Sequence, residues 1–223
     1  MDLKKIIEII NFKFFLSFMM IRKEIDKLKE MIHIMCRKTE GIYQSSLEVL
    51  KKKNVQLMNE VLNMDVDLNK MEVEIDNACL NILALKDPYA LDFRYIVSVM
   101  KSTRDLERIG DESKTIAKWS IKSDLDFNTN TDLQELVQNT TEALQHAIHA
   151  LLYESKEHAE KCLKLENNID EYEEKILDKN PILASGLIIR ALERIGDLST
   201  NIAENVIYYL EAKDIRHQEY EKL

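Results

Sequence analysis

Turn-forming residues and cysteine are scarce in this chain, and each scarcity excludes a class of structure. The 223 residues include only 4 glycines and 2 prolines, so we expect long helices joined by few connections. The 3 cysteines, Cys36, Cys79 and Cys162, lie far apart in the sequence. This spacing excludes a disulfide framework and a zinc site built on paired cysteines, and it predicts reduced, buried thiols.

Positive charge is also in deficit. The formal net charge is −9, which excludes a general nucleic-acid binder because such proteins present a basic surface. The natural complements of an acidic protein are cations and basic patches on partner proteins. Hydrophobic residues make up 45% of the chain, which is enough for one large domain or two small ones with real cores.

The first 22 residues differ from the rest. Residues 6–21 are rich in Ile, Phe and Met, but charged and polar residues interrupt them, so the uncharged run is too short to span a membrane. No small-residue cleavage site for a signal peptide is present. Three interpretations stay open: an extra apolar helix packed on the body, a weak interfacial anchor, or a stretch upstream of a start at Met19 or Met20. We favour the last, because regular helical patterning begins only near Glu24.

Beyond this segment, apolar residues recur at three- and four-residue intervals, which is the helical period. The predicted helices cover residues 24–53, 54–87, 91–119, 133–153, 157–177 and 182–213. The prediction is therefore an all-α protein made of two tandem three-helix bundles. Its parts are an extension (1–22), a first repeat (23–122), a linker (123–131), a second repeat (132–217) and a tail (218–223).

The hexamer Leu-Glu-Arg-Ile-Gly-Asp occurs twice, at residues 106–111 and 192–197. Such an exact repeat indicates an internal duplication. Each copy has Glu and Asp four residues apart, which places both carboxylates on one side of a helix. Each copy also holds a glycine in mid-helix, where glycine costs about 0.5–1 kcal/mol relative to alanine, so we expect a neighbouring helix or a ligand to come close there.

Two interpretations of the carboxylate pairs remain open. Arginines three residues before each acid could form ordinary helical ion pairs, worth only about 0.2–0.5 kcal/mol each. Alternatively, carboxylates from several helices converge on Mg, Mn, Fe or Zn in each half. The predicted metal ligands are Glu107, Asp111, Glu193 and Asp197, and the candidates for further ligands on neighbouring helices are Asp65, Asp76, Glu166 and Asp170.

Other motifs are weaker. Glu30 and His33 have the spacing found in di-iron bundles, but that chemistry needs two such motifs and this one is best explained by chance. His146 and His149 lie three residues apart, their counterparts in the first half are not histidines, and we expect a partly buried or surface pair. We find no triad, phosphate-cradling glycine loop or Cys-His signature, so the sequence predicts a protein without catalytic activity.

Taken together, these residues resemble the PhoU family of bacterial accessory proteins of phosphate transport. The resemblance covers residues 24–217, and its most specific feature is the duplicated Glu-x3-Asp hexamer. It is carried by three segments: residues 83–97, residues 101–111 and residues 192–204, together with Arg216 and His217.

Membership would imply two bundles related by pseudo-two-fold symmetry, with multinuclear metal binding through Glu107 and Asp111 and through Glu193 and Asp197. It also implies a cytoplasmic protein, or one held at the inner face of the membrane by its partners. Its role would be negative regulation of phosphate uptake and of the phosphate-starvation response. It would exert that role by coupling the ATPase subunit of a phosphate ABC transporter to a sensor histidine kinase.

The sequence departs from an even duplication, so the two sites, if both bind metal, should not be equal. Lys118 stands where the second half has Glu204, and Asn69 stands where it has Asp170. We expect a homodimer or a higher oligomer, because long amphipathic helices leave apolar surface to share. The alternatives to a regulator are a carboxylate-bridged metal-dependent enzyme and a purely structural helical scaffold.

Overall fold

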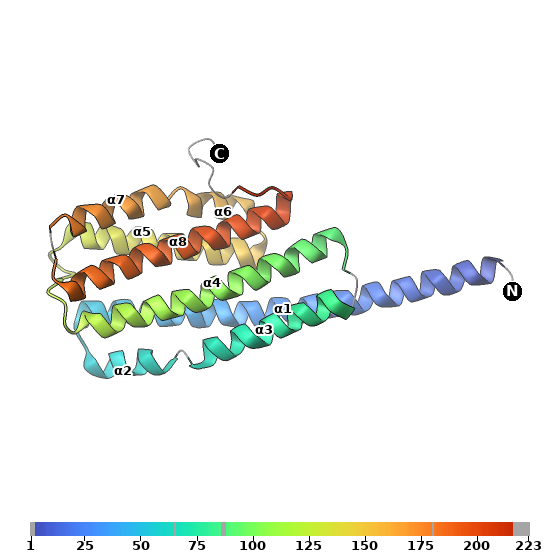
Figure 1. The fold of residues 1–223 in the computed structure, drawn as a ribbon, viewed down its shortest axis with the longest axis horizontal. Helices are drawn as coiled ribbons and strands as arrows, with labels where there is room; N and C mark the ends of the chain where they lie inside the picture. Colours follow the sequence, from blue (N-terminus) through green and yellow to red (C-terminus); the bar gives the residue numbers. More distant parts are fainter. Residues whose placement is uncertain (1–2, 65, 86–87, 180, 216–223) are drawn as a thin grey trace.

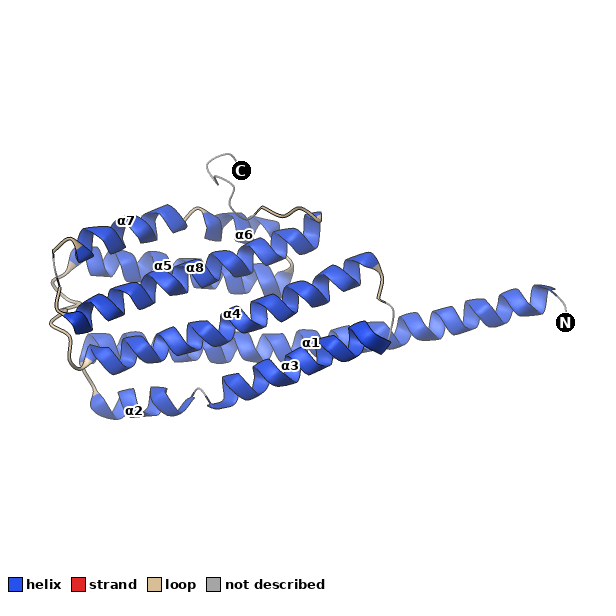
Figure 2. Cartoon of the chain, viewed as in Figure 1, coloured by secondary structure: helices blue, strands red, loops and turns tan. Residues whose placement is uncertain are grey.

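All regular secondary structure is helical in the part of the chain that the computed structural model describes, and loops join the helices (Figure 2). The described residues are 3–64, 66–85, 88–179 and 181–215, with side chains from residue 19 onward, those of residues 66 and 85 excepted. The predicted all-α class is confirmed.

The first half consists of four helical segments. Helix α1 (Leu3–Lys52) is followed by α2 (Val55–Met64), α3 (Val66–Leu85) and α4 (Ala90–Ser120). Between α1 and α2, Lys53 has a positive φ of 52°, and the side chain of Asn54 accepts hydrogen bonds from the amides of Gln56 and Leu57 in the first turn of α2. The chain therefore reverses within two residues.

The second half repeats this plan. Helix α5 (Thr131–Tyr153) is followed by α6 (Lys156–Leu163), α7 (Glu166–Leu177) and α8 (Leu183–Glu211). Asn130 caps α5 and Ser155 caps α6, each accepting a hydrogen bond from a backbone amide of the first turn.

The middle helix of the second half is interrupted, and this corrects the predicted continuous helix at 157–177. In the first half, α2 and α3 are separated by Asp65, which lies outside the described residues. α2 ends at Met64 before α3 begins, and α6 ends at Leu163 before α7 begins. In the second half, the amide of Leu165 bonds to the carbonyl of Cys162 (3.0 Å), a tighter turn than an α-helix makes. Apolar periodicity continues across such a break, which is why periodicity alone did not reveal it.

The two halves pack against each other chiefly through α4 and α8, which lie side by side at the centre of the molecule (Figure 1). Buried Ser98 donates from Oγ to the carbonyl of Asn205 (2.8 Å), and Arg94 Nε donates to the carbonyl of Tyr209 (3.1 Å). One hydrophobic core runs through both halves, and it contains all three cysteines as free, buried thiols, as predicted.

The N-terminal segment is continuous with α1 rather than a separate helix. Its backbone projects beyond the ends of the other helices (Figure 1), so the interpretation of an extra helix packed on the body is wrong for the described residues. Helical structure therefore begins well before Glu24. Within the described part of the chain, none of the helices is both long enough and apolar enough to cross a membrane.

Candidate metal centre

The duplicated hexamers occupy equivalent positions on α4 and α8. Buried Thr39 on α1 donates from Oγ1 to the carbonyl of Leu106, the first residue of one hexamer (3.4 Å). Buried Thr140 on α5 makes the same contact to the carbonyl of Leu192, the first residue of the other (3.4 Å). Each half therefore holds its hexamer against its own first helix by the same bond.

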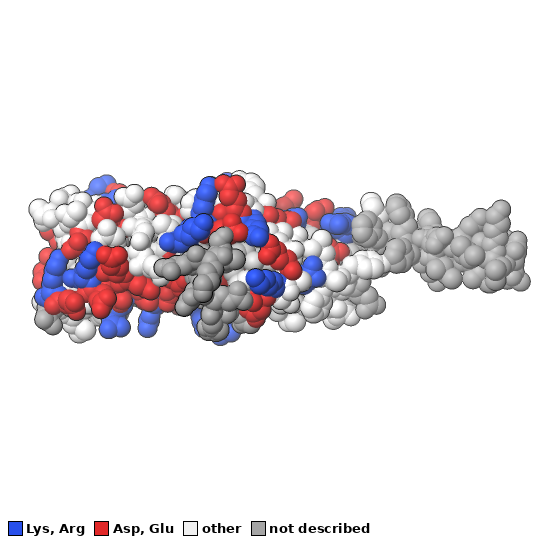
Figure 3. All heavy atoms as spheres, turned by 90° about the horizontal axis from the view of Figure 1, so that it is seen from above, with Lys and Arg blue, Asp and Glu red and all other residues white. Residues whose placement is uncertain are grey.

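In the second half, the hexamer's carboxylates meet a third carboxylate from the neighbouring helix. Glu193 and Asp197 extend from α8 and Asp170 extends from α7, with one oxygen of each within 4.8 Å of the others. Figure 3 shows acidic side chains gathered at the end of the molecule where α7 lies, with basic side chains among them. Across the described part of the chain, this is the one group of three acids, histidines or cysteines that converges so closely.

These carboxylates destabilise one another's charged forms. Burial, followed by the negative charges of Asp197 and Glu173, raises the pKa of Glu193 to about 8. Burial and then the charge of Asp170 raise the pKa of Glu166 to about 7. The pKa values of Asp170 and Asp197 are also raised, chiefly by burial. Without a cation the cluster retains a proton near neutral pH, and a divalent ion would relieve the same repulsion.

Gly196 explains how α7 and α8 come so close beside this cluster. A Cβ atom at Gly196 would lie 2.8 Å from Cδ1 and 3.1 Å from Cγ2 of Ile169 on α7. Ile169 is the residue immediately before Asp170, so the missing side chain lets α7 bring that carboxylate to the α8 pair. The predicted close approach at this mid-helix glycine is confirmed, and the approaching group is a helix.

The first half does not assemble an equivalent group from its described residues. Lys114 Nζ lies 2.6 Å from Oδ1 of Asp111, and the two side chains form an ion pair across one helical turn. The second half has Thr200 at this position, which donates to the backbone carbonyl of Asp197 (2.8 Å) and leaves the Asp197 carboxylate open. Glu107 is half-buried on α4 and makes its own contacts there. An ammonium group thus stands where the second half could hold a metal ion.

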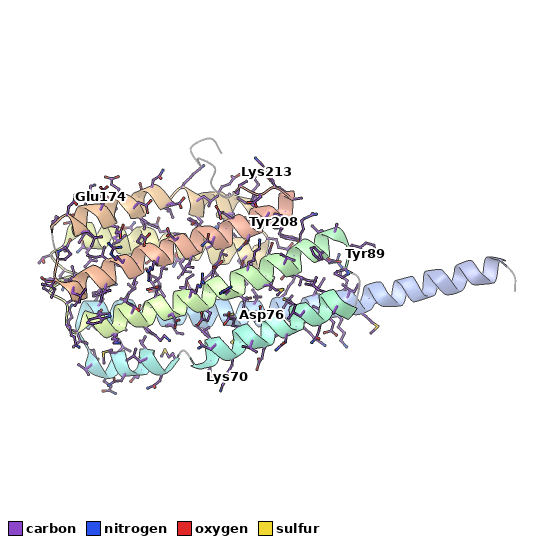
Figure 4. The ribbon with its side chains drawn as sticks, viewed as in Figure 1. Lys70, Asp76, Tyr89, Glu174, Tyr208 and Lys213 are labelled. Carbon is purple, nitrogen blue, oxygen red and sulfur yellow. The ribbon has the colours of Figure 1, made fainter. Side chains whose placement is uncertain are left out.

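Two further candidate ligands of the first half have different outcomes. Asp76 lies between α3 and α4 (Figure 4), where burial raises its pKa and Arg104 opposes the shift. Its Oδ1 is buried and has no hydrogen-bond partner among the described residues. Asp65 lies outside the described residues. In the second half, burial likewise raises the pKa of Glu173 on α7, and Arg190, the counterpart of Arg104, opposes that shift.

At the second hexamer, the arginine makes a different ion pair from the predicted one. Arg194 Nη1 pairs with Glu112 across the two halves (3.0 Å), rather than with the acid three residues on. Both hexamers line a cleft of about 370 Å³ between α4 and α8. Its lining residues are Arg108, Asp111, Glu112, Arg194, Asp197, Leu198 and Asn201.

The donor set of the second-half cluster fits a metal ion. Asp170, Glu193 and Asp197 offer only carboxylate oxygens, the ligands of Mg²⁺, Mn²⁺ and iron. The pKa of each is raised, chiefly by burial, and Arg194 opposes this shift only at Asp197. Glu166, half-buried on the same helix face one turn before Asp170, is the available fourth ligand. The assignments of Glu107, Asp111, Glu193 and Asp197 as ligands stay predictions, and only the second pair has a third carboxylate beside it.

Sequence reasoning missed three residues of this region. Lys114 could have been found by comparing the halves position by position after the hexamers, and Glu173 by its position three residues after Asp170 on a predicted helix. His158, which lies against His146 with Nδ1 atoms 2.9 Å apart, is on the next helix, so helical spacing within α5 could not reveal it.

The PhoU domain model matches residues 32–120 and 133–206 of the chain. A PhoU homologue of Pseudomonas aeruginosa, named a phosphate-specific transport system accessory protein, is 32% identical over 72% of this chain and 73% of its own. PhoU homolog 1 of Thermotoga maritima is 29% identical over 87% of this chain and 90% of its own. The crystal structure of PhoU from Pseudomonas aeruginosa superposes with a TM-score of 0.81 at 27% identity, covering 86% of this chain and 99% of that one.

Proposed function

The chain belongs to the PhoU family, and we propose that it is a non-enzymatic, metal-dependent negative regulator of phosphate uptake and of the phosphate-starvation response. Its relatives are named accessory proteins of the phosphate-specific transport system, which supports a role in regulating phosphate transport. The observation that carries the metal-dependent part is the convergence of Asp170, Glu193 and Asp197 on the helices that the family model matches.

The second-half cluster would hold the ion. Glu193 and Asp197 would bind it from α8, and Asp170 would bind it from α7, with Glu166 in reach on the same helix. A bound divalent ion supplies positive charge and open coordination positions, which carboxylates of a partner or phosphate oxygens can occupy. The protein's own contribution is to hold three carboxylates together, with Glu193 half-buried and the two aspartates exposed to solvent and to a partner.

The proposed partners are the ATPase subunit of a phosphate ABC transporter and a sensor histidine kinase. A regulator that binds one state of its partner more tightly than another shifts the partner's equilibrium toward that state. We place the protein in the cytoplasm, at the inner face of the membrane when it is bound to the transporter. The acidic, metal-loaded face at α7 and α8 is the surface we assign to this contact, and we expect the protein to act as a homodimer or higher oligomer.

Metal content tests the site directly. We expect untagged wild-type protein to contain metal in stoichiometric amount by plasma mass spectrometry, and the E193Q/D197N variant to lose it while keeping its helical circular dichroism. The matched control is E107Q/D111N in the first half, which we expect to retain the metal. Equal metal content in all three proteins would overturn the assignment. An E193Q/D197N protein that loses its fold but keeps its metal would favour the interpretation that these carboxylates only form salt bridges and packing contacts.

Phosphate uptake tests the regulatory role. In bacterial cells that lack their own PhoU protein, the wild-type chain should restore low uptake of labelled phosphate in phosphate-rich medium. E193Q/D197N should leave uptake high, whereas E107Q/D111N should behave like wild type. If wild type itself fails to lower uptake, the regulatory proposal is wrong, whatever the metal content.

A further inference from the structure

A second cluster of ligand-type side chains lies on α5 and α6, apart from the carboxylates of α7 and α8. The Nδ1 atoms of His146 and His158 are 2.9 Å apart, and the ring of His149 meets the ring of His158 edge-on at a centroid distance of 5.1 Å. His146 and His158 are half-buried, whereas His149 is exposed. The first half has no counterpart of this cluster, so the internal duplication does not account for it.

The local structure holds the two facing imidazoles in place. Glu154 adopts a left-handed conformation (φ 52°) directly after α5, and Ser155 then caps α6 by accepting a hydrogen bond from the amide of His158 itself (3.3 Å). The hairpin between α5 and α6 is therefore only two residues long. His158 is fixed in the first turn of α6, opposite His146 in the last turns of α5.

We propose that His146 and His158 form a binding site for a borderline transition-metal ion such as Zn²⁺, Cu²⁺ or Ni²⁺. Metal–nitrogen bonds of about 2.0–2.1 Å place two ligand nitrogens about 2.9 Å apart at the roughly 90° angles of tetragonal Cu²⁺ or Ni²⁺, and about 3.3 Å apart at the tetrahedral angle of Zn²⁺. The pair already has the shorter separation, and a small rotation of either ring gives the longer one. Imidazole nitrogen suits these ions, whereas the carboxylates on α7 and α8 suit harder ones. The chain would thus carry two cation sites of different chemistry.

The charges around the pair are compatible with a cation. Burial, followed by the neighbouring His158 and Lys161, lowers the pKa of His146, which keeps that ring neutral and able to bind at neutral pH. The negative charge of Glu142 on α5 opposes this shift of the His146 pKa. Glu157 on α6 also places negative charge near the pair, and it forms an ion pair with Lys161 (2.6 Å).

A metal ion bound only by His146 and His158 would keep further coordination positions for other ligands. In the described part of the chain, no third acid, histidine or cysteine offers an atom within 4.8 Å of both facing nitrogens. His149 is exposed and already touches the ring of His158, so a side-chain rotation is what it needs to supply a third nitrogen. Water would fill the rest of the coordination sphere.

The experiment is a Zn²⁺ titration against a chromogenic chelator, carried out in the E193Q/D197N background so that the carboxylate site is disabled. We expect one Zn²⁺ per chain, and H158Q to weaken its binding by about a hundredfold, because chelation by two linked ligands becomes binding by one. H33Q is the matched control, since His33 lies on α1 beside Arg37 (3.4 Å) and should not affect the titration.

Copper provides a second readout that a merely structural histidine pair would not give. The electron paramagnetic resonance spectrum of bound Cu²⁺ should show coupling to two imidazole nitrogens in H33Q and to fewer in H158Q or H146Q. Circular dichroism melting of each variant shows whether it is folded. Equal Zn²⁺ affinity of folded H158Q and H33Q, or Cu²⁺ without imidazole coupling, would overturn the proposal; neither result bears on phosphate regulation.

Discussion

At the scale of single residues, Gly196 sets the distance between α7 and α8. We expect Gly196→Ala to destabilise the protein by about 1 kcal/mol, since the added Cβ would meet Ile169 at 2.8 Å and overpacking outweighs the better helix propensity of alanine. Gly41→Ala is the control, because nothing lies within 4 Å of a Cβ there, and it should stabilise by about 0.5–1 kcal/mol. Urea unfolding measures both, and a Gly196→Ala protein as stable as Gly41→Ala would contradict the close packing.

The raised pKa of Glu193 predicts a pH dependence of the metal-free protein. Its folded-state pKa of about 8 lies above the ordinary value of 4.5, so the folded state binds more protons and stability falls as pH rises from about 4.5 to about 8. In chelator-treated protein, the fall between pH 5 and pH 8 should be smaller in E193Q than in wild type. Added Mg²⁺ or Mn²⁺ should stabilise wild type more at pH 8 than at pH 6, and parallel pH profiles for the two proteins would argue against a strained carboxylate cluster.

At the scale of helices, the difference between the two halves comes from α3 and α7 and from one turn of α4. Asn69 on α3 has no charge where α7 carries Asp170, and Lys114 fills the place of an ion beside Asp111. We expect N69D/K114T, introduced into the E193Q/D197N background, to bind metal that E193Q/D197N alone does not bind, as measured by plasma mass spectrometry. N69D alone should gain none, because Lys114 would still neutralise Asp111, and metal uptake by N69D alone would contradict this role of the lysine.

The helices also show which features of the fold could be predicted from the sequence. Apolar periodicity predicted the class and the outer helices, because burial of one helix face leaves that signal in the chain. It could not reveal the break after Leu163, since the buried face continues across it. The hexamer pointed to Glu193 and Asp197, but the asymmetry between the halves depends on Lys114, whose charge becomes meaningful only when its distance to Asp111 is known.

At the scale of the whole molecule, the halves are joined by polar and aromatic contacts around α4 and α8. Glu154, beside the end of α5, accepts hydrogen bonds from Lys29 on α1 (2.6 Å) and from the hydroxyl of Tyr209 (2.8 Å). The ring of Tyr209 also packs edge-on against Tyr95 of α4 (5.3 Å between centroids). Because these contacts are shared between the halves, an event at the metal cluster on α8 has a physical route to α4 and α1.

This shared interface predicts that the halves unfold together. The single Trp119 reports on the first half by fluorescence, and far-UV circular dichroism reports on both, so the two denaturation curves of wild type should coincide. Ser98→Leu should separate them, since Ser98 is only 2% exposed between α4 and α8 and a larger side chain would force these helices apart. Gln145→Leu, on the exposed face of α5, is the control and should leave the curves coincident. Coincident curves for folded Ser98→Leu would mean that the halves are coupled elsewhere, through Glu154 and the contacts of α1 with α5.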